Sequence, residues 1–204
     1  MNKKCHSELF AASVLFVGLI STAEAATIIQ NTGQFDLAIA AYDPIGQSFI
    51  AEDLRLGSIA FAFSDMNPTL ANLPVTMTLY EGAGFGGNVV NSVAQTLPAV
   101  LPGTYDTPQF IDFNFSGTDL TIGDTYTATV TTGSSYKVGV VYNGLSDAYL
   151  GGQLFHSSAS PLSSCPSGCD LNFRVTPSPV PVPGAALLFS SALIGLWRFG
   201  KKKS

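Results

Sequence analysis

Short runs of apolar and β-branched residues, each closed by Gly, Pro, Asn or Asp, fill the middle of the chain. The clearest run alternates the large residues Ile59, Phe61 and Phe63 with alanines, which is the two-residue period of a half-buried strand. No helical period of useful length occurs between the two ends of the chain. Strands are predicted over residues 46–51, 59–63, 75–80, 109–115, 125–131, 137–142, 149–155 and 171–175. Their number and spacing predict an all-β fold, an antiparallel two-sheet sandwich of the jelly-roll kind.

The first 25 residues have the pattern of a secretory signal peptide. Lys3 and Lys4 precede an apolar run over residues 9–20, and Ala23 and Ala25 then form a small-residue cleavage site. Cleavage is expected after Ala25 or nearby. The alternative is a retained membrane anchor, although the apolar run is short for a membrane span.

The chain ends in three segments of different character. Residues 177–184 alternate proline with Ser and Val, so they are expected to form an extended linker clear of the domain. The apolar residues 185–200 predict a short transmembrane helix, about 24 Å long against a hydrocarbon core of about 30 Å. The predicted cytoplasmic stop consists of Arg198, Lys201, Lys202 and Lys203, within and after that helix. The alternative for residues 185–200 is a buried core helix, which the triple lysine and the lack of a polar face disfavour.

Charge divides the chain in the same way as hydropathy. Six of the nine basic residues lie in the two terminal segments, which leaves Arg55, Lys137 and Arg174 between residues 26 and 176. That segment holds 12 of the 14 acidic residues, so its formal charge is 3 − 12 = −9. A domain with this charge repels phosphate backbones, which argues against nucleic-acid binding.

The C-terminal segments resemble the PEP-CTERM sorting signal, on the run Val180-Pro181-Val182-Pro183-Gly184 followed by the apolar residues and the lysines. The similarity is to the variant with a Val-Pro-x-Pro core, since Val182 stands where the common form has Glu. The resemblance covers about an eighth of the chain. It implies a Gram-negative bacterium in which an exosortase-type membrane protease recognises Pro181 and Pro183 and removes or exchanges the tail. The implied partners before that step are the Sec export machinery, signal peptidase and the inner membrane.

The central segment has a weaker resemblance to exported β-sandwich domains, loosely similar to carbohydrate-binding modules, that precede such tails. The motifs are 46–51 (Gly-Gln-Ser-Phe-Ile-Ala), 79–84 (Leu-Tyr-Glu-Gly-Ala-Gly), 122–126, 149–152 and 170–174, in that order. The resulting division is a signal peptide at 1–25, a β-sandwich domain at 26–176, a linker with the sorting motif at 177–184, a transmembrane helix at 185–200 and a basic stop at 201–204.

Cys165 and Cys169 predict a structural disulfide. Cys5 precedes the apolar run and is expected to leave with the signal peptide, so these two are the remaining cysteines of an exported chain. Pro166 and Gly168 between them favour a tight turn. A redox pair usually has two intervening residues instead of three, and a zinc site needs more ligands.

Residues that could carry catalysis are few. His156 is the histidine that remains after processing, and Glu52, Asp53 and Glu81 are acids without a selected partner. The glycines of residues 82–87 are interpreted as a mobile hairpin loop, since neither a helix nor a lysine follows to make a phosphate site.

Ligand binding stays open. All seven tyrosines lie in the central segment, at positions 42, 80, 105, 126, 136, 142 and 149, and exposed ones would stack on sugar rings. No stacking residue is selected by the sequence. Calcium is neither supported nor excluded, because Asp and Asn turns are frequent but EF-hand spacing does not occur. No other cofactor is expected.

Together these features predict a non-catalytic exported protein. It is expected to be held in the inner membrane as a precursor and then delivered to the cell surface or extracellular matrix, in a structural or binding role. A carbohydrate-binding module for extracellular polysaccharide is the first alternative, and a surface glycoside or ester hydrolase is the second.

Overall fold

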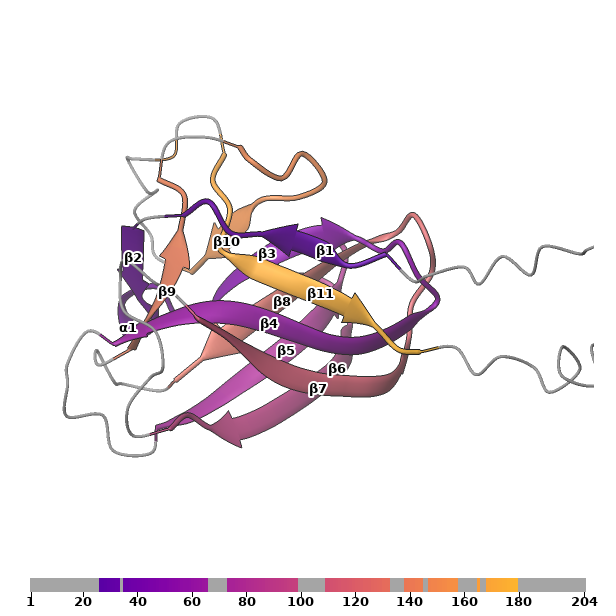
Figure 1. Ribbon diagram of the computed structural model, residues 1–204, viewed down its shortest axis with the longest axis horizontal. Helices are drawn as coiled ribbons and strands as arrows, with labels where there is room; N and C mark the ends of the chain where they lie inside the picture. The colour runs from indigo at the N-terminus through magenta and orange to yellow at the C-terminus, as the bar shows by residue number, and fades with distance from the viewer. Residues whose placement is uncertain are drawn as a thin grey trace, which may run out of the picture.

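The computed structural model describes residues 26–33, 35–65, 73–98, 109–132, 138–144, 147–157, 165 and 168–179. These residues form two antiparallel sheets packed face to face (Figure 1). The predicted all-β class with two antiparallel sheets is therefore confirmed.

The larger sheet is built around β4, its longest central strand. One edge of β4 pairs with β7, while the other pairs first with β11 and then with β9. β1 and β2 extend the sheet beyond β11 and β9. Its strands are β1 (Ile28–Gln30), β2 (Phe35–Ala38), β4 (Arg55–Asp65), β7 (Gln109–Asp119), β9 (Val138–Tyr142) and β11 (Phe173–Pro177).

The smaller sheet has five strands in the order β10-β3-β8-β5-β6. Its strands are β3 (Ile45–Ile50), β5 (Pro74–Glu81), β6 (Val89–Thr96), β8 (Thr125–Thr131) and β10 (Leu154–His156). A four-residue helix, α1 (Ile39–Tyr42), lies between β2 and β3. Side-chain hydrogen bonds link β6 of this sheet to β7 of the other, including Asn91 Nδ2 to Thr118 Oγ1 at 2.7 Å.

The core lies between the sheets and contains the large residues of the alternating runs. Ile59, Phe61 and Phe63 of β4 are all buried, as the alternation predicts. Ala60 and Ala62 point to the other side of the sheet but are buried as well. In the ladder they lie opposite Arg174 and Phe110, and the Arg174 guanidinium lies over the Phe110 ring.

Several predicted strand boundaries are wrong. The strand expected over 149–155 begins only at Leu154, because the amide of Tyr149 is bound by a side chain and Gly152 N turns back to Tyr149 O. The strand expected over 171–175 runs from Phe173 to Pro177 instead. The sequence reading missed β1, β2, β6 and α1, which are short or carry weak alternation.

The first and last strands of the described chain are neighbours. β1 pairs with β11 so that Ile28 lies opposite Val175, and the two strands run in opposite directions. Chain entry and chain exit therefore lie at the same end of the sandwich (Figure 1). β11 includes Pro177, and Ser178 N donates to Arg55 O at 2.9 Å, so the predicted linker over 177–184 is bound to the domain at its start.

Within the described ranges, no helix has the length and hydropathy needed to cross a membrane. The helix predicted over 185–200 lies outside those ranges.

Candidate functional site

The outer face of the five-stranded sheet carries hydroxyl groups on neighbouring strands. The register places Thr78 of β5 between Thr129 of β8 and Ser92 of β6. Thr78 Oγ1 and Ser92 Oγ are 3.1 Å apart. We call this surface the threonine face; its central hydroxyl residues are Ser48, Thr76, Thr78, Ser92, Thr127, Thr129 and Thr131. Ser48, Thr127 and Thr129 are buried, whereas Thr76, Thr78 and Thr131 are half-buried and Ser92 is exposed. Among the described residues that point outward from these strands, none is charged.

Two phenylalanines from distant parts of the chain meet over this face. The ring centroids of Phe85 and Phe155 are 6.2 Å apart, in an edge-to-face arrangement that aromatic rings prefer. Both side chains are half-buried. Phe155 lies opposite Gly46 in the β3–β10 ladder, and a Cβ on Gly46 would lie 2.3 Å from Ala128 O. Position 46, opposite Phe155, therefore requires a glycine because a side chain there would collide with the Ala128 carbonyl.

Thr127 holds the loop that carries Phe85. Its Oγ1 donates to Gly82 O at 2.7 Å and accepts from Gly84 N at 2.9 Å. Gly82 and Gly84 both have positive φ, which a residue with a side chain adopts only with strain. The glycine-rich loop is therefore a hairpin connection, as the sequence predicts. The prediction that this loop is mobile did not include its two hydrogen bonds to Thr127 of the sheet.

The tyrosines within the described ranges do not form a common stacking surface. Tyr126 and Tyr142 are buried in the core, and the Tyr149 ring packs edge-on against Phe173 at 5.2 Å. Tyr149 Oη accepts a hydrogen bond from Ile50 N, while burial raises the pKa of this phenol. Tyr80 is half-exposed on the threonine face.

Three of the seven tyrosines remain. Tyr42 packs edge-on against His156 with centroids 5.4 Å apart. Tyr105 and Tyr136 lie outside the described residues.

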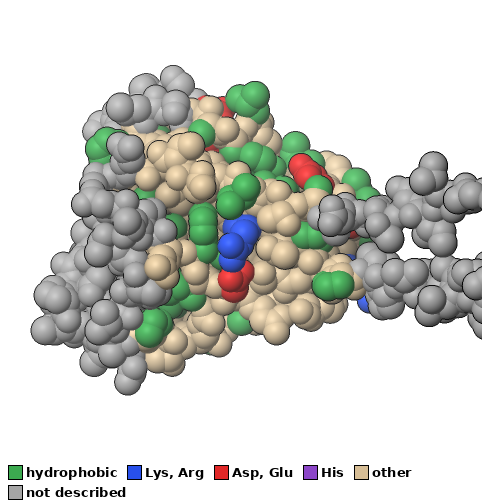
Figure 2. All heavy atoms as spheres, in the orientation of Figure 1, with side chains coloured by type: hydrophobic (Ala, Val, Ile, Leu, Met, Phe, Trp, Pro, Cys, Tyr) green, Lys and Arg blue, Asp and Glu red, His purple; other side chains and the backbone are tan. Residues whose placement is uncertain are grey.

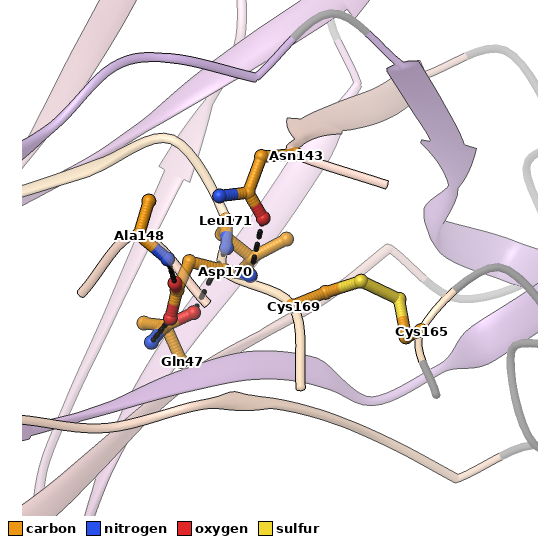
Figure 3. Close-up of a disulfide and its surroundings, with 7 residues drawn as sticks. All are labelled: Gln47, Asn143, Ala148, Cys165, Cys169, Asp170 and Leu171. Carbon is orange, nitrogen blue, oxygen red and sulfur yellow. Dashed lines mark hydrogen bonds between the residues drawn. A yellow bond between two sulfur atoms is a disulfide. The ribbon is translucent and has the colours of Figure 1, made fainter. Parts of the chain in front are cut away.

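A buried polar cluster lies beside the disulfide (Figure 3). The Asp170 side chain is fully enclosed, and its Oδ1 accepts from Gln47 Nε2 at 2.8 Å. Its Oδ2 accepts from the amides of Ala148 and Tyr149, at 2.8 and 2.9 Å. Burial raises the pKa of Asp170, and these three donors oppose that shift. We call Asp170 and its side-chain partners Gln47 and Asn143 the Asp170 cluster.

The same cluster binds the backbone on both sides of Asp170. Gln47 Oε1 accepts from Leu171 N, and Asn143 Oδ1 accepts from Asp170 N, both at 2.8 Å. In return Asn143 N donates to Asp170 O at 2.9 Å. Segments around residues 47, 143, 148 and 170 are thereby fixed to one another, so the cluster serves the fold.

Cys165 and Cys169 are joined by a disulfide with their Cα atoms 5.4 Å apart. This is the pair that the sequence assigns to a structural bond. Cys169 is buried, and its carbonyl accepts from Leu154 N of β10 at 2.7 Å. The bond therefore tethers residue 165 directly to the segment that carries Asp170.

The candidate catalytic residues are not assembled into a relay. His156 lies half-buried against Tyr42, burial lowers its pKa, and its Nδ1 has no partner. The neighbouring Ser157 hydroxyl donates to the backbone carbonyl of Asp43 instead of to the imidazole. A Ser-His-Asp mechanism needs the hydroxyl and imidazole joined, so this arrangement gives the hydrolase alternative no support.

The acidic residues considered as catalytic candidates, Glu52, Asp53 and Glu81, lie in two different parts of the chain. Glu81 Oε2 accepts from Asn88 Nδ2 at 2.8 Å across the base of the hairpin loop. Glu52 and Asp53 lie in the turn between β3 and β4, beside Arg55. In the part of the chain that the structure describes, no group of three His, Cys, Asp or Glu residues could hold a metal ion.

The residues of the export and sorting signals lie outside the described ranges. They are Ala23, Ala25, Val180, Pro181, Val182, Pro183, Gly184, Arg198, Lys201, Lys202 and Lys203. Their roles stay predictions.

Comparison with known protein families gave no match, and comparison with curated proteins also gave none.

Sequence reasoning missed the phenylalanine pair and the Asp170 cluster. The threonines of the 125–131 run alternate with apolar residues, which was a usable sign of one hydroxyl-bearing face. Phe85 and Phe155 are 70 residues apart, and no local pattern connects them.

Proposed function

We propose that this chain is an exported protein, sorted by a PEP-CTERM-like C-terminal signal and delivered to the cell surface or extracellular matrix in a non-catalytic role. The sandwich, of the jelly-roll kind, is the delivered domain. The N-terminal signal peptide and the C-terminal helix hold the precursor in the inner membrane, where signal peptidase and an exosortase-type protease act on it.

The observation that supports this proposal most is the shared end of the two terminal strands. β1 and β11 are antiparallel neighbours, so both segments with membrane-directed sequences continue from one end of the domain. If the two ends of the domain lay at opposite poles, one terminal segment would have to run back along the domain surface before both could enter the same membrane.

The disulfide also supports export. A bond between Cys165 and Cys169 persists in an oxidising compartment and is rare in the cytosol.

The processing proposal is tested by mass spectrometry of the protein recovered from the cell surface. The mature chain is expected to begin near Ala26 and to end near Pro183. A double substitution of Pro181 and Pro183 by alanine should leave the tail uncut and the chain in the membrane, whereas the matched change of Pro177 and Pro179 should not. Surface protein that still carries Lys203 would contradict the proposal.

A second candidate function is binding of a neutral polysaccharide at the threonine face. The observation that favours it is the half-buried pair Phe85 and Phe155 on the same face as the accessible hydroxyl groups of Thr76, Thr78 and Ser92. Aromatic rings contact the C–H faces of sugars, and hydroxyls exchange hydrogen bonds with theirs.

This candidate is tested with a glycan array and the substitutions Phe85→Ala and Phe155→Ala. Both should abolish binding of a neutral glycan. Phe35→Ala is the matched control, since Phe35 is a partly exposed phenylalanine of the other sheet. Equal binding by all four proteins would reject the threonine face as the site.

A further inference from the structure

The end of the sandwich where the chain enters and leaves carries three exposed large apolar residues. Leu54 and Ile122 are exposed over 63% and 56% of their surface, and Ile50 over 39%. These residues lie in the β3–β4 and β7–β8 connections or at their border. Both connections lie at the end from which the two chain termini continue (Figure 1).

Backbone hydrogen bonds join the two connections into one surface. Ala51 N donates to Asp124 O, Gly123 N to Ala51 O, and Leu120 N to Leu54 O, at 2.8 to 2.9 Å. Single exposed apolar residues are ordinary on protein surfaces, but here three large ones lie on two bonded loops. We call Ile50, Leu54 and Ile122 the apolar end.

The C-terminal segment leaves the domain directly beside this surface. Ser178 N donates to the carbonyl of Arg55, the residue after Leu54. The six residues from 179 to 184 then separate the domain from the predicted transmembrane helix. If extended at about 3.1 Å per residue, these six residues would hold the domain within about 19 Å of the bilayer that the predicted helix would enter.

The charges of this end select the kind of lipid. Glu52, Asp53 and Asp124 lie on the same connections, and Arg55, the adjoining base, is already paired with Asp119 at 3.1 Å. Carboxylates are repelled by an anionic lipid surface, whereas a zwitterionic surface accepts them close to apolar side chains that enter the interface.

We propose that the apolar end rests on the zwitterionic lipid surface of the membrane and orients the precursor domain before its tail is cut. The proposal rests on the proposed function, because the tail must place the domain at a bilayer. The apolar end supplies contact and orientation, and the tail supplies the tether. Neighbouring Pro177 and the linker after it would then emerge at the membrane surface, where a membrane protease works.

The test uses the full precursor in phosphatidylcholine vesicles containing lipids brominated near the headgroup. Trp197 is the only tryptophan of the chain, so its fluorescence in the unsubstituted protein reports on the tail alone. In a Trp197→Phe background, Ile122→Trp then reports on the apolar end. The matched control is Phe35→Trp, because Phe35 lies on β2 at the opposite end of the sandwich (Figure 1).

The brominated lipids are expected to remove most of the emission of the tryptophan at position 122 and to leave that at position 35 unchanged. Replacing half of the phosphatidylcholine by phosphatidylglycerol should reduce the quenching at position 122. Adding Leu54→Ser to the Ile122→Trp protein should reduce it further. These results would support contact between the apolar end and zwitterionic lipid.

Unquenched emission at position 122, together with quenched Trp197 in the unsubstituted chain, would overturn the docking proposal and leave the tail assignment intact. Unquenched Trp197 would instead overturn the membrane role of the tail and with it the proposed function. Equal quenching at positions 122 and 35 would show that the domain lies on the bilayer without this orientation, and would also overturn the proposal. Stronger quenching in phosphatidylglycerol would contradict the choice of lipid.

Discussion

Asp170 and Arg174 are four positions apart on one segment, but their charged groups lie in very different surroundings. The Asp170 carboxylate is enclosed and accepts three N–H groups, one from Gln47 and two from the neighbouring residues Ala148 and Tyr149. The Arg174 guanidinium lies on the outer face of the six-stranded sheet, 2.7 Å from Asp112 and 5.2 Å from the centre of the Phe110 ring. Figure 2 shows a basic group directly beside an acidic one near the middle of that face.

The difference shows how burial determines the contribution of a polar contact to the free energy of unfolding. When one partner of a surface ion pair is removed, water takes its place, so the loss of stability is small. Water does not readily reach the donors around Asp170, so their desolvation would stay uncompensated. The Asp170 cluster is therefore expected to determine stability, while the Arg174 pair is expected to contribute little.

The largest effect is expected from Asp170→Ala. The substitution leaves the amides of Ala148 and Tyr149 and the Gln47 side chain without an acceptor, at a cost of about 3 kcal/mol or more in the free energy of unfolding. Chemical denaturation followed by circular dichroism measures it. Asp112→Ala is the surface control, and a loss as large as that of Asp170→Ala would break the comparison.

Loss of the disulfide is expected to have the next largest effect. Changing Cys165 and Cys169 together to serine should cost about 2 kcal/mol, since the bond closes a ring of only five residues. Denaturation with and without a reductant measures this cost. The reductant should lower the stability of the native chain and leave the double variant unchanged; sensitivity of the variant would point to another cause.

Thr127→Val tests a buried polar group of intermediate importance. The change keeps the shape of the side chain but removes both hydrogen bonds to the glycine-rich loop, and about 1 to 2 kcal/mol should be lost. Limited proteolysis should then cut the loop at residues 82–88. Thr76→Val, at a half-exposed position of the same face, should leave the loop resistant. Equal proteolysis of both variants would show that Thr127 does not hold the loop.

The pH dependence of stability separates the buried carboxylate from exposed ones. Burial raises the pKa of Asp170 in the folded state, so the folded protein binds its proton more tightly than the unfolded chain does. This contribution to stability is complete below about pH 4 and is lost as pH rises through the raised pKa. Burial likewise raises the pKa of Asp36 and Asp43, which contribute in the same direction.

The measurement for this prediction is the slope of unfolding free energy against pH between about 4 and 7. Asp170→Asn should make the slope less negative than in the native chain, because one raised pKa has been removed. Asp112→Asn is the matched control. Identical slopes for the native and Asp170→Asn proteins would contradict the role given to burial.

The smallest effect is expected from Arg174→Gln. Its side chain is partly exposed and paired at the surface, so a loss of about 1 kcal/mol or less is expected, and high salt should reduce it. Arg55→Gln is a still more exposed comparison, since Arg55 and Asp119 are exposed over 59% and 75% of their side chains. A large, salt-independent loss at Arg174 would mean that packing on Phe110 matters more than the ion pair.

The candidate surfaces were predictable only in part. Alternation in the 125–131 run indicates that its threonines share a face, but it does not indicate that the loop over residues 82–87 folds onto them. The buried position of Asp170 had no local sign, since an Asp beside a Cys is compatible with an exposed turn. The apolar end likewise depends on loops separated by about 70 residues that meet only in the fold.

The sequence by itself determined the sheet class, the inward position of Ile59, Phe61 and Phe63, and the five-residue disulfide ring. These features depend on side-chain period or on residues close in the chain, so local information suffices. The tertiary structure alone decided that Asp170 is enclosed, that Phe85 meets Phe155, and that β1 lies beside β11. Each of these depends on contacts between distant segments, and a local pattern of side chains does not specify which distant segments meet.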